Sequence, residues 1–170
     1  DGSVSYYGAN DISGSRSDAT LSADGTSVLW NLTSISDNLR NSSTSIFFHY
    51  TKGQTGFGNN EILIDNVQYS GNTVEFHYDT DVTREDVRSG YVMGASVENK
   101  ARLNNIEIKN HHSVVIRKYQ LDYEIDTVSK VHRIAHIQEC GGVSNACYEP
   151  TVFDWYNTLT HSTRSIANVN

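Results

Sequence analysis

The stretch Val115–Ile125, VIRKYQLDYEI, alternates between two kinds of side chain along its whole length. One face carries Val115, Tyr119, Leu121, Tyr123 and Ile125, with Arg117 among them, and the other carries Lys118, Gln120, Asp122 and Glu124. Successive side chains of a β-strand point to opposite faces, so a period of two over this length predicts a half-buried strand. The stretch therefore favours an all-β fold.

Further strands are expected on both sides of this stretch. The clearest signal is a hairpin over 62–78, in which Ser70-Gly71-Asn72 forms a tight turn between the strand Ile62–Tyr69 and the alternating segment 74–78. The other expected strands are Ser27–Ile35, Ile46–Tyr50, Tyr91–Glu98, Leu103–Ile108 and Arg133–Glu139. The segments 64–79 and 103–124 each form a hairpin that ends in Tyr plus an acid, and such repeats stack into an extended sheet. The predicted fold class is all-β with antiparallel sheets, either a β-sandwich or an extended curved hairpin sheet.

Length and composition fit a globular β domain. The chain has 170 residues, of which 37% are hydrophobic, with ten Tyr, five Phe, twelve Gly and one Pro. This length fits one domain that buries a core of its own, and the aromatic content suits strands. We expect a single all-β domain over 1–156, followed by a tail or linker to a further domain over 157–170. Because the chain starts at Asp1 and its only Met is Met93, we expect a processed form or an excised part of a longer protein.

The negative net charge of the chain argues against nucleic acids and anionic membranes as partners. The formal net charge is -7, and no cluster of Lys and Arg is present. Nucleic acids and anionic membranes are polyanions that bind clustered basic side chains. We therefore expect no nucleic-acid binding. No apolar run approaches the ~20 residues of a membrane-spanning helix, so no membrane insertion by this domain is expected either.

The two cysteines lie close together in the sequence. Cys140 and Cys147 flank a short loop that begins with Gly141 and Gly142. In an exported protein this spacing indicates a local disulfide, whereas in a cytosolic protein it would leave two reduced thiols. A structural metal site would need four ligands, and no second pair is evident. We favour the disulfide.

Several short motifs together resemble a known family. They are Trp30-x-Leu32-x-x-Ile35-x-Asp37, Ile46-x-Phe48-x-Tyr50, Tyr69-x-x-Asn72, Val74-Glu75-Phe76-x-Tyr78, Arg102-Leu103-x-x-Ile106, Arg117-x-Tyr119-x-Leu121-x-Tyr123, Ile137-x-Glu139-Cys140 and Cys147-x-x-Pro150-x-x-Phe153-x-Trp155. In this order they resemble the β-rich region of SpvB-type virulence proteins and of the B component of insecticidal toxin complexes (Tc toxins), which are related to Rhs/YD-repeat proteins. The last motif is the most specific, because strands of Tyr, Val and Ile are common.

The resemblance implies a role rather than a reaction. It implies a β domain that precedes a β-propeller of FG-GAP/VCBS type, within a large secreted bacterial shell that encloses a toxic polypeptide. Its partners would be other domains of the same polypeptide or other toxin subunits. In SpvB-type proteins the ADP-ribosyltransferase activity lies in a separate C-terminal domain. No Glu-x-Glu motif of that kind occurs here, so we do not expect the chain to be an enzyme.

An acidic segment is the candidate for a cation site. Its carboxylates are Asp79, Asp81, Glu85 and Asp86. Carboxylates at this density can bind Ca²⁺, although the pattern is not that of an EF-hand. A solvated acidic loop is the favoured interpretation, so no cofactor or metal is expected, with calcium as the alternative. His132 and His136 have the spacing of a zinc-binding helix, but on a strand they would be roughly 13 Å apart, too far to share a metal.

Aromatic side chains separate the two functional hypotheses. The preferred hypothesis is a non-catalytic structural β domain of a toxin-related shell, and the alternative is a carbohydrate-binding, lectin-like β-sandwich. A lectin exposes two or three rings around a groove, whereas a shell segment should expose few. Most rings fall on faces expected to be core, and the exceptions that could contact a glycan are Tyr6, Tyr7 and Tyr148.

Overall fold

The computed structural model describes residues 2–8, 16–37, 43–79, 84–144 and 146–155. These residues form strands, turns and loops, with no helix among them, and so none that could span a membrane. The strands are β1 (Val4–Tyr7), β2 (Thr20–Ala23), β3 (Thr26–Trp30), β4 (Leu32–Ser36), β5 (Ile46–Lys52), β6 (Ile62–Tyr69), β7 (Asn72–Asp79), β8 (Arg88–Val92), β9 (Ala95–Asn99), β10 (Arg102–Lys109), β11 (Val115–Ile125), β12 (His132–Gly141) and β13 (Thr151–Val152). The predicted all-β class is confirmed.

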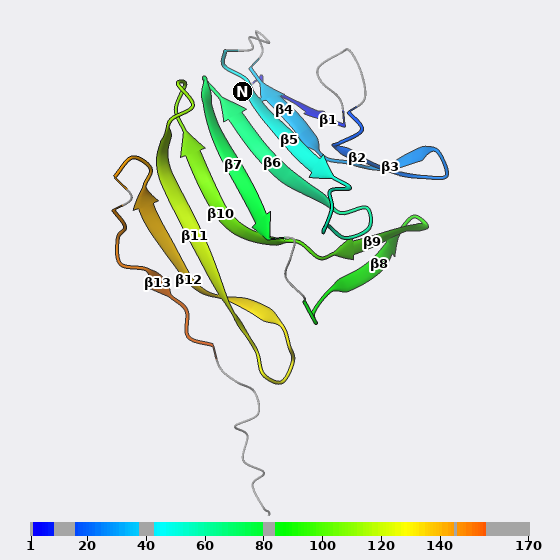
Figure 1. Ribbon diagram of the computed structural model, residues 1–170. Coiled ribbons are helices and arrows are strands. Elements are labelled where there is room, and N and C mark those ends of the chain that lie inside the picture. The colour runs from blue at the N-terminus through cyan, green and yellow to red at the C-terminus, as the bar shows by residue number, and fades with distance from the viewer. Residues whose placement is uncertain (1, 9–15, 38–42, 80–83, 145, 156–170) are drawn as a thin grey trace, which may run out of the picture.

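One large antiparallel sheet dominates the fold. It has nine strands in the order β1-β4-β5-β6-β7-β10-β11-β12-β13. From β4 onward it is a meander that is interrupted once, between β7 and β10, by the two-stranded hairpin β8–β9. A second hairpin, β2–β3, is inserted between β1 and β4. The sheet is twisted and curved, and both hairpins project toward the same side of the view (Figure 1). The extended curved sheet is therefore the correct form of the prediction.

The predicted hairpin over 62–78 is confirmed as β6–β7. Val67 pairs with Val74 and Tyr69 with Asn72, and Ser70 and Gly71 make the turn with φ of 47° and 78°. Positive φ at both central residues is the geometry that matches the twist of a two-residue hairpin. The long stretch from Val115 forms β11, where Leu121 and Tyr123 are half-buried while Gln120 and Asp122 are exposed.

Two expected strands are each divided in the structure. The segment Ser27–Ile35 is not one strand, because the chain leaves the β2–β3 hairpin at Asn31 and enters the large sheet as β4. The Asn31 amide donates to the Ala19 carbonyl, which fixes this crossing. The segment Tyr91–Glu98 is likewise a hairpin, because Met93 and Gly94 form a turn with φ of 49° and 90°.

Tyrosine hydroxyls donate hydrogen bonds to backbone carbonyls of the neighbouring strand where the regular ladder ends. The ladder between β6 and β7 ends at Asn66 and Glu75, beyond which the strands diverge. There the Tyr78 hydroxyl donates to the Ile64 carbonyl at 2.9 Å. Tyr50 reaches Leu32 and Tyr123 reaches Leu103 in the same way, each at 2.7 Å. Burial raises the pKa of Tyr78 to about 12, so this donor keeps its proton at neutral pH.

The sheet buries very little apolar surface completely. Among the described residues, the buried hydrophobic side chains are Ala19, Leu21, Ala101 and Cys140. Leu21 and Thr33 are the largest side chains that are fully buried, and they lie on β2 and β4. Most other described strand residues are only half-buried, and the other sheets that the described residues form are the two-stranded hairpins β2–β3 and β8–β9. Among the described residues, the largest fully buried side chains therefore lie around β2 and β4, while Ala101 and Cys140 are buried elsewhere.

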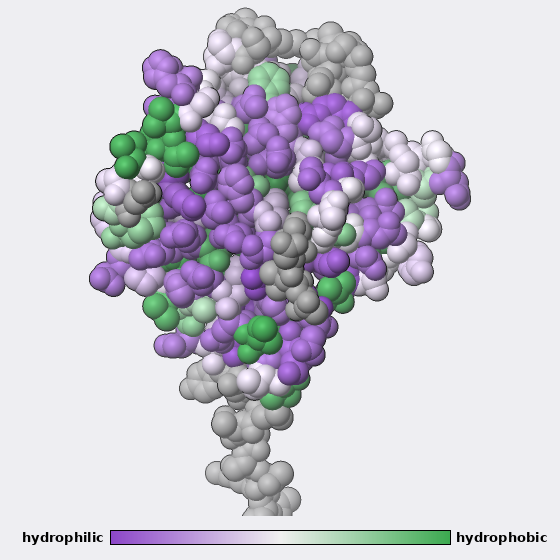
Figure 2. All heavy atoms as spheres, in the orientation of Figure 1, coloured by the Kyte–Doolittle hydropathy of each residue, from purple (hydrophilic) through white to green (hydrophobic). Residues whose placement is uncertain are grey.

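Many aromatic rings that were expected to be core are exposed. Trp30, Tyr69, Tyr91 and Trp155 all rank among the exposed large hydrophobic side chains, as do Phe153 and two of the expected exceptions, Tyr7 and Tyr148. Tyr91 is 79% exposed and Trp30 is 55% exposed. On the face in Figure 2 the hydrophobic residues are scattered within a mainly hydrophilic surface. The prediction of few exposed rings is wrong, since alternation identifies a face but not whether anything covers it.

Candidate functional site

In the acidic segment that was considered for calcium, Asp79 and Asp86 form ion pairs with arginines. Asp79 accepts hydrogen bonds from Arg102 at 2.8 Å and from Asn104 at 2.5 Å. Burial opposes ionisation of Asp79, but these hydrogen bonds hold its pKa below the usual range. Glu85 is exposed, and Asp81 lies outside the described residues. The structure does not bring the described members together as a group of metal ligands.

Asp86 lies at the centre of a second, more buried ion pair. The Arg84 guanidinium binds both of its oxygens, at 2.8 Å and 3.0 Å, and the backbone amide of His132 donates to it at 3.0 Å. The hydrogen bonds from Arg84 hold the pKa of Asp86 far below its usual value, against the effect of burial and with help from the His132 amide. Asp79 and Asp86, two of the four acids considered as calcium ligands, thus form ion pairs with Arg102 and Arg84.

These ion pairs fasten the β8–β9 hairpin to the large sheet. Arg84 also donates to the carbonyls of Lys100 and Ala101, at 3.3 Å and 3.1 Å, just after β9. Arg102, the first residue of β10, stacks over the ring of Tyr123 with its guanidinium carbon 4.6 Å from the ring centre. Nη1 of Arg102 also lies 2.9 Å from Nδ1 of His132. The cluster therefore joins the hairpin, β10, β11 and β12.

Glu61 holds the other side of the same hairpin. Its side chain is buried, and its carboxylate accepts from three backbone amides, those of Gly58 at 2.7 Å, Lys100 at 2.9 Å and Ala101 at 3.1 Å. Buried amides need such partners, because each one left unpaired would cost about 1–3 kcal/mol. Glu61 therefore fixes where the hairpin leaves the sheet. It was not singled out from the sequence, because its partners are backbone groups of distant residues.

The predicted disulfide is present. Cys140 and Cys147 are bonded, and they also form a β-bridge at the end of β12. Gly142 is required here, because a Cβ atom at this position would lie 2.0 Å from the Val115 carbonyl oxygen. Beside the bridge is a shallow pocket of about 320 Å³ whose polar lining includes Arg117, Glu139 and Tyr148. Arg117 and Glu139 pair at 3.2 Å across it.

The three tyrosines considered for glycan contact do not form one site. Tyr7 is 58% exposed and Tyr148 is 72% exposed, while Tyr6 is half-buried. Tyr6 and Tyr7 lie on β1 at one end of the sheet, and Tyr148 follows β12 at the other end. Seven strand spacings separate β1 from β12, about 34 Å along the sheet at the usual spacing of about 4.8 Å. The rings therefore cannot line a common groove.

The histidines that share a helix-like spacing have separate partners. His132 contacts Arg102, and His136 Nε2 lies 2.9 Å from a carboxylate oxygen of Asp122 on β11. Both lie on one strand, β12, which begins at His132, one residue before the expected start at Arg133. His111 and His112 lie in the exposed turn before β11, with their ring centres 3.8 Å apart. None of these histidines belongs to a group of three candidate metal ligands in the described part of the chain.

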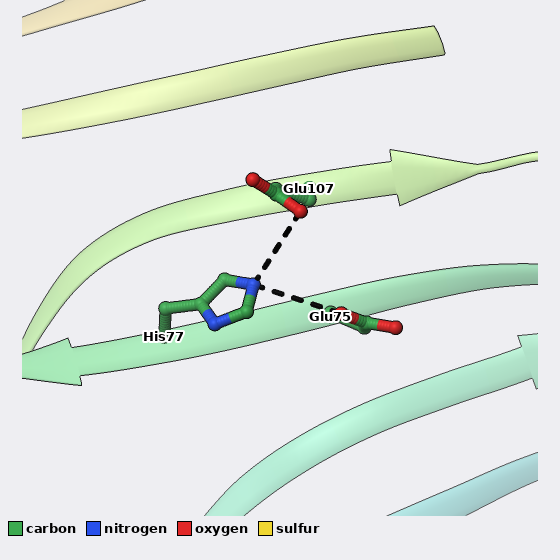
Figure 3. A group of neighbouring side chains, drawn as sticks. All are labelled: Glu75, His77 and Glu107. Atoms are coloured by element: carbon green, nitrogen blue, oxygen red, sulfur yellow. Dashed lines mark ion pairs between the residues drawn. The ribbon is translucent and has the colours of Figure 1, made fainter. Parts of the chain in front are cut away.

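Sequence analysis missed the one such group that the described residues contain. It consists of Glu75 and His77 on β7 and Glu107 on β10. Nε2 of His77 lies 3.7 Å from Oε2 of Glu75 and 3.7 Å from Oε2 of Glu107 (Figure 3). The signal available in the sequence was Glu-x-His on a strand, which places both side chains on one face. Glu107 joins them only through the pairing of β7 with β10.

Comparison with known proteins identifies the fold. No protein-family model matches the sequence, and no curated protein matches it in sequence. In structure, the chain is similar to a chain in the crystal structure of TcdB2-TccC3-Cdc42, with a TM-score of 0.67 and 12% identity. The match covers 88% of this chain and 10% of that chain, so this chain spans about a tenth of its length. The chain therefore has the fold of a segment of a Tc toxin component.

Proposed function

We propose that this chain is a non-catalytic structural β domain of a large secreted bacterial toxin-related protein, in which it forms part of a shell or scaffold around a toxic polypeptide. The observation that carries the proposal is the nine-stranded curved sheet, in which very few apolar side chains of the described residues are fully buried. Such a sheet acquires a covered face only from neighbouring domains or subunits, and these are its proposed partners.

The two edge strands of the sheet differ in a way that is consistent with a segment of a larger shell. At one end the chain itself covers β12, since the amides of Tyr148 and Phe153 donate to the carbonyls of Glu139 and Ala135. At the other end lies β1, and no described strand pairs with its outer edge. An unpaired edge readily associates with another strand. In a shell, a neighbouring segment would continue the sheet from β1.

The Tc toxin likeness supports the same role, and the disulfide is typical of exported proteins. Arg84 pairs with Asp86 and Arg102 with Asp79, so these charged side chains already have partners within the chain. The lectin alternative is not favoured, because its three tyrosines lie at opposite ends of the sheet. No specific observation supports a glycan groove.

Hydrogen exchange can test the proposal directly. We would compare the 170-residue chain with the native protein isolated from its source, measured under the same conditions. In a shell, amides of β1 and backbone around the exposed rings should exchange more slowly in the native protein, because neighbours cover them. Recovery of the native protein as a 170-residue monomer with unchanged exchange would contradict the proposal. A glycan array probed with the chain, with Tyr7→Ala and Tyr148→Ala as matched variants, would reveal the lectin alternative.

A further inference from the structure

The strands β7 and β10 bring three potential metal ligands onto one surface. Glu75 lies directly opposite Glu107 in the antiparallel register, and His77 follows Glu75 on the same face of β7. Figure 3 shows the imidazole directed between the two carboxylates. The three ligand atoms all lie within 4.8 Å of one another. All three side chains are partly exposed, so an ion could enter from solvent.

We propose that Glu75, His77 and Glu107 form a binding site for a divalent transition-metal ion, with Zn²⁺ as the best fit. Zinc binds imidazole nitrogen and carboxylate oxygen at about 2.0–2.2 Å, so tetrahedral ligand atoms lie roughly 3.4 Å apart. The observed separations from His77 Nε2 to each carboxylate are 3.7 Å, within a few tenths of an ångström of that value. Three protein ligands leave the fourth position to water.

The ligand set favours zinc over calcium. Ca²⁺ takes six to eight oxygen ligands, and an imidazole is not among those it prefers. An imidazole with two carboxylates suits Zn²⁺ and similar ions. The residues of the acidic segment therefore take no part in this site, which lies on the strands themselves.

Two lysines make the proposal specific. Lys109 Nζ lies 2.6 Å from Oε2 of Glu75 and 3.8 Å from Oε2 of Glu107, the same oxygens that face His77. Its ammonium therefore competes with a metal ion for these atoms. Lys118 contacts the other oxygen of Glu107, at 3.7 Å, and leaves Oε2 available. Removal of Lys109 should strengthen metal binding, whereas removal of Lys118 should change it little.

A bound ion would connect two strands that are distant in sequence. The β8–β9 hairpin separates β7 from β10 along the chain, and the ion would link the two strands within their ladder, away from the Asp79–Arg102 pair at which the hairpin departs. A ligand that binds only the folded state raises the melting temperature as its concentration rises. The proposed site therefore couples the stability of the sheet to divalent metal, a property independent of the shell function.

Calorimetric titration of the metal-free chain with ZnCl₂ tests the site. We expect one ion per chain, an affinity that falls by more than about tenfold in His77→Gln and in Glu107→Gln, and no comparable binding of CaCl₂. The affinity should rise about twofold to fivefold in Lys109→Gln, the range that an exposed ion pair is worth. Lys118→Gln is the matched control, and the double variant His111→Gln/His112→Gln controls for binding at the exposed turn.

A spectroscopic measurement separates loss of the site from loss of the fold. Co²⁺ in place of Zn²⁺ should give the visible absorption of a four-coordinate ion, which His77→Gln abolishes while circular dichroism still reports a folded sheet. Zinc binding that is unchanged in both His77→Gln and Glu107→Gln would overturn the proposal. Weaker binding in Lys109→Gln would overturn it as well, because the lysine would then support the ion rather than compete with it.

Discussion

Glu61→Gln is the substitution that most directly tests how the fold is held together. The Glu61 carboxylate is 4% exposed and accepts from Lys100 and Ala101 through one oxygen and from Gly58 and Ala101 through the other. Glutamine has nearly the same shape but turns one of these acceptors into a donor. That donor would point at backbone amides, which are donors themselves.

The expected loss follows from these contacts. Hydrogen bonds to a charged group contribute about 1.5–3 kcal/mol each, and the substitution removes the charge and one acceptor oxygen. We therefore expect Glu61→Gln to lower the free energy of unfolding by about 2–4 kcal/mol, a large part of the roughly 5–15 kcal/mol of a typical domain. Urea unfolding followed by tyrosine and tryptophan fluorescence measures this value. Hydrogen exchange should show the amides of Lys100 and Ala101 losing protection first.

Glu98→Gln provides the matched control on the same hairpin. The Glu98 carboxylate accepts a single exposed hydrogen bond, from the Asn59 amide at 3.0 Å. Loss of its charge should cost no more than about 1 kcal/mol, because solvent replaces an exposed partner. Equal effects of the two substitutions, or a Glu61→Gln effect within about 0.5 kcal/mol of zero, would refute the assignment of Glu61 as the anchor of the hairpin.

Four further outcomes are expected. Thiol titration of the unfolded, unreduced chain should find neither Cys140 nor Cys147 free, and a free thiol would contradict the bridge. Leu121→Ala should cost about 1–3 kcal/mol, below the range for a fully buried leucine because the side chain is half-buried, whereas Gln120→Ala should stay within about 0.5 kcal/mol. The pKa of Asp86 is lowered in the folded state, so its carboxylate contributes its full stabilisation above the unfolded pKa of about 4, and this stabilisation is lost as the pH falls below that value. In Asp86→Asn the free energy of unfolding, measured with urea, should therefore depend less on pH on the acid side. Sedimentation velocity of the chain should show concentration-dependent association through the β1 edge, and a monomer at all concentrations would argue against that open edge.

Local features explain which strands could be predicted from the sequence. The β6–β7 hairpin was predicted because the alternation over 74–78 and the Ser70-Gly71 turn both act over a few residues. The β8–β9 hairpin was mistaken for one strand, because its turn places Met93 at positive φ, and methionine gives no turn signal. The break at Asn31 was missed for another reason. There the chain passes between two sheets, and no local pattern indicates which sheet a strand will join.

The candidate metal site likewise combines a feature that is local in the sequence with one that depends on strand pairing. Glu75 and His77 share one face of β7 by alternation alone, which the sequence contains. Glu107 lies beside them only because β10 pairs with β7 across the inserted hairpin, with Glu107 opposite Glu75. The disulfide, in contrast, joins cysteines that are close in sequence, and it was predicted correctly.

By itself, the sequence determined the strand content, most turn positions, the local disulfide and the outward direction of Gln120 and Asp122 on β11, because these depend on contacts a few residues apart. Only the tertiary structure decided the order of the strands, the nine-stranded sheet and the exposure of rings such as Trp30 and Tyr91. It also decided that Asp79 and Asp86 pair with arginines, and that Glu61 anchors a hairpin through the amides of Lys100 and Ala101. These features depend on which strands meet across long insertions, and alternation along a strand specifies a face but not the neighbour that covers it.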